Sequence, residues 1–260
     1  MAKVIAVVNQ KGGVGKTTSC INLAASLAVT NKRVLLIDLD PQGNATMGSG
    51  VDKNNLSYSV NDILLSRVQL TDALATSPAN YKVLPANNDL TEAEIFLIKH
   101  SDGQRALSQA LQAHLDKFDF VLIDCPPSLN MLTINALAAA DSVLIPMQCE
   151  YYALDGLASL IKTMEQIRST LNPSLVIEGL LRTMFDPRNK LSVDVSNQLL
   201  SHFGQKVYRT VIPRNVRLAE APSHGIPALM YDKRSQGAVA YLVLAGEMLR
   251  KHQQQESKVS

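Results

Sequence analysis

The feature that most constrains this chain is a glycine-rich loop, QKGGVGKTT, at residues 10–18, which directly follows a short apolar run at residues 4–8. This order is typical of a strand, a loop and a helix. Glycines let successive backbone N–H groups close around phosphate oxygens, and the helix that follows offers its positive end. Lys16 would then reach the β- and γ-phosphates, and the Thr17 hydroxyl would bind Mg²⁺. A turn without a ligand is the alternative, but Gly, Lys and Thr together after a strand favour phosphate binding.

The loop departs from the strict phosphate-loop pattern, which requires a glycine five residues before Gly15. Gln10 stands at that position, and a second lysine, Lys11, follows it. This extra lysine is the unusual feature of the loop.

Length and composition indicate a folded protein with a sizeable core. The 260 residues suffice for one large α/β domain, and length alone would also allow two smaller ones, but no linker divides the chain. Charged residues make up 18% and hydrophobic residues 46%, a balance that excludes a disordered chain.

The three cysteines, Cys20, Cys125 and Cys149, lie far apart without C-x-x-C spacing, so neither a disulfide framework nor a zinc site is expected. Cys125 follows an aspartate and would suit a metal or iron–sulfur cluster, but no second cysteine is placed to share it. A buried structural thiol is favoured, and no cluster is expected. No secretory leader and no run of 18 apolar residues is present, so we expect a cytoplasmic protein.

Apolar runs and helical patterns alternate along the chain. Together they predict an α/β fold, a doubly wound and mainly parallel sheet with helices on both faces. Strands are expected at residues 4–8, 33–40, 81–85, 118–124, 142–146 and 175–184. Helices are expected at residues 19–29, 60–65, 90–115 with a break near 101–103, 129–139, 153–171, 193–203 and 238–251. Residues 48–80 are otherwise polar and indicate no function.

Two expected strands end in aspartates. Residues 38–44 read DLDPQGN, and the apolar run at 118–124 ends in Asp124. Open parallel sheets bind ligands at the carboxyl ends of their strands. Asp124 is therefore expected to contact Mg²⁺ through water, opposite Thr17. Asp40 is expected to orient the attacking water or to act in the outer shell of Mg²⁺, although an isolated Asp-Pro stretch would more often cap a turn.

Positive charge gathers in the last third of the chain. Residues 182–234 hold nine Lys or Arg against four acids, which gives +5, and because the whole chain is +2, the remainder is −3. Most of these cations stand in expected loops, where they suit contacts with a phosphate backbone rather than recognition of bases. A solvated surface is the alternative explanation.

Four stretches together resemble the ParA/Soj partition ATPases, and the likeness covers essentially the whole chain. They are KGGVGKTT at 11–18, DLDPQGN at 38–44, IDCPPS at 123–128 and VIPRNVR at 211–217. The loop alone is shared with the division ATPase MinD and with nitrogenase iron protein, so it identifies only the superfamily. The DPQGN and PRNVR stretches narrow the resemblance to ParA.

The resemblance implies an ATPase of low intrinsic turnover that binds ATP and Mg²⁺ and forms a nucleotide sandwich dimer. It further implies that the homodimer binds double-stranded DNA without sequence preference, and that a ParB-type centromere-binding protein stimulates hydrolysis. A cytoplasmic, nucleoid-associated protein of chromosome or plasmid partition is therefore expected. Larger plasmid relatives carry an N-terminal helix-turn-helix region. Because the loop begins at residue 10, we expect none here and a single domain over residues 1–260.

The resemblance also assigns roles to residues. Lys11 would reach the nucleotide of the other subunit, Lys16 would hold phosphates within its own, and Asp40 would serve hydrolysis. A cation supplied in trans makes hydrolysis conditional on dimerisation, as an arginine finger does. Gly12 would leave room where two loops approach, and Arg214 is open to a place in the nucleotide pocket. The nucleotide-binding set is Lys11, Gly12, Gly13, Val14, Gly15, Lys16, Thr17, Thr18, Pro213 and Asn215. The metal set is Thr17, Asp40 and Asp124, and the DNA set is Arg188, Arg217, Lys233 and Arg234.

Two other functions compete with this one. A MinD-like ATPase that cycles on the membrane would attach by a C-terminal amphipathic helix, but residues 251–260 hold one aliphatic residue, so no membrane association is expected. A metabolic phosphate-transferring enzyme would need a second pocket, for which no motif is visible, and this reading ranks last.

Overall fold

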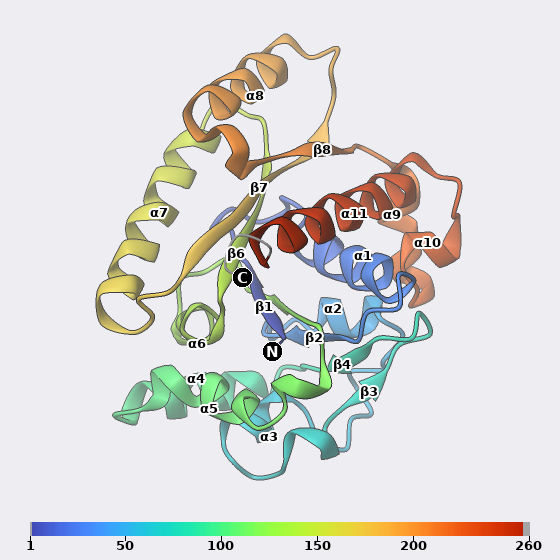
Figure 1. Ribbon diagram of the computed structural model, residues 1–260. Helices are drawn as coiled ribbons and strands as arrows, with labels where there is room; N and C mark the ends of the chain where they lie inside the picture. Colours follow the sequence, from blue (N-terminus) through green and yellow to red (C-terminus); the bar gives the residue numbers. More distant parts are fainter. Residues whose placement is uncertain (1, 257–260) are drawn as a thin grey trace.

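The computed structural model describes residues 2–256, which form one eight-stranded sheet in the order β3-β4-β2-β5-β1-β6-β7-β8 (Figure 1). Every neighbouring pair is parallel except β3 and β4. The strands are β1 (Lys3–Val7), β2 (Val34–Asp38), β3 (Ala75–Thr76), β4 (Lys82–Leu84), β5 (Phe120–Asp124), β6 (Ser142–Gln148), β7 (Val176–Phe185) and β8 (Val207–Pro213). The predicted mainly parallel α/β sheet is confirmed.

Helices cover both faces of this sheet (Figure 1). They are α1 (Lys16–Ala28), α2 (Asn44–Gly48), α3 (Val60–Leu64), α4 (Leu90–Lys99), α5 (Ala106–Gln112), α6 (Met131–Ala139), α7 (Ala153–Thr170), α8 (Lys190–Phe203), α9 (Val216–Glu220), α10 (Ala228–Tyr231) and α11 (Gln236–Glu256). Along β1, alternate residues enter two separate buried clusters, one with Val4 and Ala6 and one with Ile5 and Val7. A strand buried on both faces is apolar throughout, which is why this run lacks the alternation of a half-exposed strand.

The longer predicted elements are confirmed, whereas several short ones were missed. α2, α9 and α10 have four or five residues each and form in stretches for which the sequence predicted no helix. A helix of one turn is too short to show a 3.6-residue period, so periodicity could not indicate it. As a consequence, Arg217 lies on a short helix rather than in a loop.

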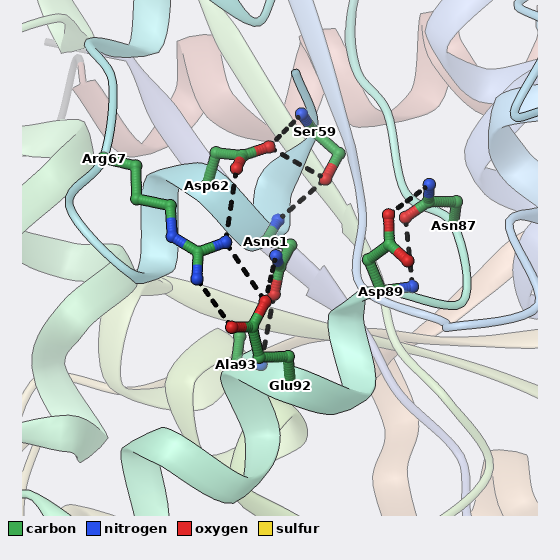
Figure 2. A network of polar contacts seen from close by, with 8 residues as sticks. All are labelled: Ser59, Asn61, Asp62, Arg67, Asn87, Asp89, Glu92 and Ala93. Atoms are coloured by element: carbon green, nitrogen blue, oxygen red, sulfur yellow. Dashed lines mark hydrogen bonds and ion pairs between the residues drawn. The ribbon is translucent and has the colours of Figure 1, made fainter. Parts of the chain in front are cut away.

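A polar network organises part of the stretch that the sequence left uninterpreted (Figure 2). The Ser59 side chain caps α3, and Asp62 accepts a hydrogen bond from the Ser59 N–H at 2.9 Å. Arg67 donates to Glu92 of α4 at 2.6 Å, and buried Asn61 accepts from the Ala93 N–H at 3.1 Å. These contacts fix α3 against α4, so this region has a structural role.

The outer strand β8 is irregular, and charged side chains form hydrogen bonds with its backbone N–H and C=O groups. The register of β7 with β8 shifts twice. The guanidinium of Arg182 donates to the carbonyl oxygens of Tyr208 and Arg209 at 2.9 and 3.0 Å. On α11, the Glu247 carboxylate accepts from the N–H groups of Arg209 and Thr210 at 2.8 and 3.0 Å. Arg182 is only 7% exposed, so counting it with the basic surface of the last third was wrong.

Candidate nucleotide-binding site

The glycine loop joins β1 to α1 and leaves the first turn of that helix open. Gly13 and Gly15 have φ angles of 74° and 87°, a left-handed backbone that a larger residue would adopt only with strain. Gly15 is the N-cap residue and offers no side-chain hydrogen bond to the helix. The first backbone N–H groups of α1 therefore remain available to an anionic ligand.

Neighbouring strands hold this loop in place. The Thr183 hydroxyl on β7 donates to the Val14 carbonyl at 2.8 Å. Asn9 accepts from the Lys11 N–H at 2.9 Å and donates to the Pro146 carbonyl at 2.8 Å. The loop is thus shaped by the fold before any ligand arrives, which reduces the ordering that binding requires.

Lys16 lies inside the loop and is only 7% exposed. Its Nζ donates to the Lys11 carbonyl at 3.2 Å, so the side chain curls back over the loop. Burial lowers the pKa of Lys16, and the nearby Asp124 carboxyl opposes that effect. A phosphate placed here would stabilise the charged ammonium, which is the arrangement that the sequence predicts.

Asp124 is completely buried at the end of β5, beside the Thr17 hydroxyl, which hydrogen-bonds to it. The Cys20 thiol also faces it, at 3.6 Å from Oδ1, whereas Oδ2 has no partner among residues 2–256. Burial and the neighbouring charge of Asp38 raise the pKa of Asp124. An unpartnered buried carboxylate oxygen next to a threonine hydroxyl fits Mg²⁺, which is held by few protein ligands together with phosphate oxygens.

Asp38 also lies in this site, whereas sequence reasoning assigned a role only to Asp40. It lies opposite Asp124 in the β2–β5 register and is completely buried. Its Oδ2 accepts from the Thr46 N–H and hydroxyl at 2.8 and 2.7 Å, and its Oδ1 accepts from the Asp40 N–H at 3.1 Å. Burial raises the pKa of Asp38 against the effect of these hydrogen bonds. Asp38 thus fixes both ends of the loop that carries Asp40.

Thr46 extends this arrangement away from the site. Its hydroxyl also accepts from the Ala86 N–H at 2.9 Å, which ties α2 to the loop after β4. The Asp-x-Asp pattern indicated a pair of carboxylates, but nothing in the sequence paired Asp38 with Thr46. Asp40 itself is half-buried and accepts from the Gln42 N–H at 2.9 Å, so it does cap a local turn. This contact leaves its other oxygen available for the predicted role.

Lys11 pairs with Glu150, which follows β6, within its own subunit. Sequence reasoning missed Glu150, because the two residues are 139 positions apart. A Cβ atom added to Gly12 would meet nothing within 4 Å. Any requirement for glycine at this position must therefore come from a ligand or a second molecule.

The other predicted nucleotide residues lie at the end of β8 and beside α1. Pro213 ends β8, and Asn215 precedes α9 with its Oδ1 buried and unpartnered within the described part of the chain. A buried polar atom without a partner is rare in folded proteins and suits a ligand contact. Thr17 and Thr18 also border a cavity of about 400 Å³ between α1 and α2. The remaining lining residues are Ile21, Asn44, Met47, Gly48, Pro222 and Ser223.

The four predicted DNA residues are exposed but do not form one cluster. Arg188, between β7 and α8, pairs with Asp186 at 2.8 Å. Arg217 pairs with Glu220 at 2.7 Å and with Asp232 at 3.5 Å. Asp232 directly precedes Lys233 and Arg234, so Arg217 lies near these two residues. Arg188 lies apart from them, on the loop between β7 and α8.

Within residues 2–256, no helix combines the length and the apolar character that crossing a membrane requires.

Comparisons with known proteins place this site in context. A family model described as an AAA domain matches residues 2–177. The chain is 52% identical to the sporulation initiation inhibitor protein Soj of Bacillus subtilis, over 95% of this chain and 98% of that protein. It is 46% identical to the chromosome partitioning protein ParA of Caulobacter vibrioides, over 99% and 98%. Among solved structures, cobyrinic acid a,c-diamide synthase of Mycobacterium smegmatis with bound ADP and magnesium has a TM-score of 0.86 and 38% identity, over 97% of this chain and 96% of that one.

Proposed function

Because this chain belongs to the ParA/Soj family of partition ATPases, we propose that it is an Mg²⁺-dependent ATPase that partitions a chromosome or plasmid. The observation that carries the proposal is the buried Asp124 oxygen that has no partner among residues 2–256, next to Thr17 and Lys16 at the open end of α1. Similarity to partition proteins over nearly the whole chain gives the reaction its biological setting.

The residues of this site divide the work of binding and hydrolysing ATP. Lys16 and the backbone N–H groups of the loop bind phosphate oxygens, and Thr17 and Asp124 hold Mg²⁺, which neutralises charge on the phosphates when it is bound. Asp40 orients the attacking water, and Asp38 keeps the Asp40 loop in position. A slow reaction does not need a strong general base. Positioning of the water and the phosphates alone is therefore consistent with a low intrinsic turnover.

Two subunits complete the site. Lys11 of each subunit reaches the nucleotide bound by the other, so hydrolysis depends on dimerisation. The ATP-bound homodimer then presents Arg188, Arg217, Lys233 and Arg234 from both subunits to the backbone of double-stranded DNA. A ParB-type centromere-binding protein stimulates hydrolysis and releases the dimer, which gives a cytoplasmic protein that associates with the nucleoid while ATP is bound.

Binding to DNA of random sequence, measured with ATP, ADP and no nucleotide over a salt series, tests this function. Binding is expected with ATP only. If all four basic residues of both subunits contact phosphates, the logarithm of the binding constant falls with the logarithm of salt concentration at a slope of about −7.

A Lys16→Ala variant is the control, because it lacks the ammonium that holds the phosphates and should bind DNA no better with ATP than without. Binding of the wild-type chain that is independent of nucleotide, or absent, contradicts the proposed function.

A further inference from the structure

The residues that follow β6 hold Lys11 within its own subunit. The Lys11 ammonium donates to the Glu150 carboxylate, and the two side chains are 53% and 50% exposed. In the proposed function, Lys11 acts on the nucleotide of a second copy. The Lys11 ammonium must therefore separate from the Glu150 carboxylate before it can reach the nucleotide of the second copy.

Both partners of this ion pair are anchored through their backbones. The Lys11 N–H donates to Asn9, and the carbonyl of Cys149, next to Glu150, accepts from the Ser192 hydroxyl at 3.2 Å. Cys149 itself is buried. These contacts hold the backbone beside each partner of the ion pair in place.

Two exposed aromatic residues follow Glu150 directly. Tyr151 and Tyr152 are 72% and 73% exposed, and their rings meet edge to face with centroids 5.0 Å apart. Tyrosine combines a large apolar ring with a hydroxyl, and it is enriched at the cores of protein interfaces. A copy that receives Lys11 must approach this part of the surface, since Tyr151 is adjacent in sequence to the residue that holds Lys11. The occupant that fits is therefore a second copy of this chain.

We propose that Glu150 restrains Lys11 in the single subunit, and that a second copy packs on Tyr151 and Tyr152 as this ion pair opens. The proposal rests on the trans role of Lys11 in the proposed function. It makes Glu150 a positioning residue that opposes dimerisation, and the tyrosine pair a contact that favours it. Exposed ion pairs are weak, so the restraint shifts an equilibrium and does not block it.

The reactivity of the Lys11 amine tests the restraint by itself. Nucleotide-free protein is acylated with a limiting amount of an amine reagent, and modification of Lys11 is followed by mass spectrometry. Glu150→Gln keeps the shape of the side chain and removes its charge, so Lys11 should react faster than in the wild type. Glu92→Gln is the matched control, because it breaks the Arg67–Glu92 pair, whose exposure is similar at 47% and 55%. Equal Lys11 reactivity in all three proteins would overturn the restraint.

Sedimentation with a non-hydrolysable ATP analogue tests the effect on pairing. Two ion pairs open for each dimer, so Glu150→Gln should lower the dimer dissociation constant about twofold to thirtyfold. An unchanged or higher constant overturns the role of Glu150, and a higher one shows that its charge contributes across the interface.

The same measurement tests the aromatic surface. Tyr151→Ser with Tyr152→Ser should raise the dissociation constant at least tenfold, because the packed rings are lost. Tyr58→Ser, which alters another exposed tyrosine, should leave the constant unchanged. A wild-type constant in the double variant overturns the docking surface.

Lys11→Ala separates the failure of this proposal from the failure of the proposed function. If Lys11→Ala dimerises and hydrolyses ATP at the wild-type rate, the trans role of Lys11 is wrong, whatever the reactivity of the amine. If Lys11→Ala abolishes dimer-dependent hydrolysis and Glu150→Gln pairs as the wild type does, the proposed function stands and the restraint falls.

Discussion

Asp38 and Asp124 end neighbouring strands, and the parallel register of β2 with β5 brings both into one buried site. Burial raises the pKa of both carboxyls, and the neighbouring charge of Asp38 raises that of Asp124 further. A site of this kind is unfavourable without its ligand and favourable with a divalent cation. At this position, a change that stabilises the protein without ligand is therefore expected to weaken its affinity for the cation.

Replacing Asp124 by Asn should separate these two quantities. The unliganded protein is expected to gain on the order of 1 kcal/mol of unfolding free energy, because a carboxyl that is costly to bury next to Asp38 is replaced by a neutral amide. The Mg²⁺-dependent part of ATP affinity should fall at least tenfold. Thermal unfolding without nucleotide and calorimetric ATP titrations with and without Mg²⁺ measure the two effects.

The control for this variant is Asp119→Asn, a change at the surface carboxylate that pairs with Arg33. It should leave ATP binding unchanged. Full Mg²⁺ dependence of ATP binding in Asp124→Asn would contradict the assigned metal role.

The sequence predicted the site residues whose role follows from local spacing. Lys16 and Thr17 stand at fixed positions in the glycine loop, and Asp124 ends an apolar run. Thr46 and Glu150 were missed, because their roles depend on which distant segments meet. Pairing of Lys11 with Glu150 requires β1 to lie beside β6, a fact of the sheet order and not of any motif.

At the scale of elements, α11 is attached to the sheet through a buried polar cluster near the start of the strands. His252 donates to Glu178 at 2.8 Å and stacks on Phe120. The Glu178 carboxylate also accepts from Ser142 at 2.8 Å and from Tyr208 at 3.1 Å. Periodicity predicted the body of this helix, but it ended the helix at residue 251 and so left His252 outside it. The apolar stripe that defines the period does not include this polar contact.

The attachment of α11 should depend on pH in the acid range. Burial alone would raise the pKa of Glu178. The hydrogen bond and charge of His252 and the hydrogen bond of Ser142 outweigh this effect and bring the pKa to about 2. A carboxyl with a lowered pKa stabilises the fold above its unfolded pKa of about 4.5 and loses that contribution as the pH falls toward the folded value. The contribution is on the order of 3 kcal/mol at neutral pH.

Unfolding free energies of the wild type and Glu178→Gln, measured by denaturant between pH 7 and pH 3, check this expectation. The wild type should be the more stable at pH 7, and the difference should shrink steadily below about pH 4.5. A difference that stays constant over this range would show that Glu178 acts through packing and not through its charge.

At the scale of the whole molecule, the basic residues of the last third lie on separate elements, and nearby acids pair with Arg188 and Arg217. Arg217 contacts Glu220 and Asp232 and lies 5.9 Å from the centre of the Tyr231 ring. These contacts orient the guanidinium without burying it, so DNA phosphates can still compete for it. Overall charge alone could not have located this residue, since Arg182 counts equally in the sum and is buried.

Arg217→Glu should impair DNA binding and leave ATP-driven dimerisation intact. Each dimer loses two phosphate contacts, so the affinity should fall more than tenfold, and the slope of the salt dependence should decrease in magnitude by about 2. Filter binding over a salt series and sedimentation with ATP measure the two properties.

Arg33→Glu serves as the charge-matched control, because Arg33 precedes β2, at the opposite end of the strands from the glycine loop, and should not affect DNA binding. Loss of both DNA binding and dimerisation in Arg217→Glu would show that Arg217 supports the nucleotide site or the fold.

The charged side chains that hydrogen-bond to the β8 backbone limit the ways in which copies of this protein can assemble. An outer strand with free N–H groups is a template on which another strand can add, and repeated addition leads to open-ended aggregates. Here Glu247 occupies the N–H groups of Arg209 and Thr210, and the irregular register interrupts the straight edge that an incoming strand would need. The β8 edge of the sheet is therefore protected against the addition of a strand from another copy, so contacts between copies on this side would involve side chains of helices and loops and not a continuous sheet.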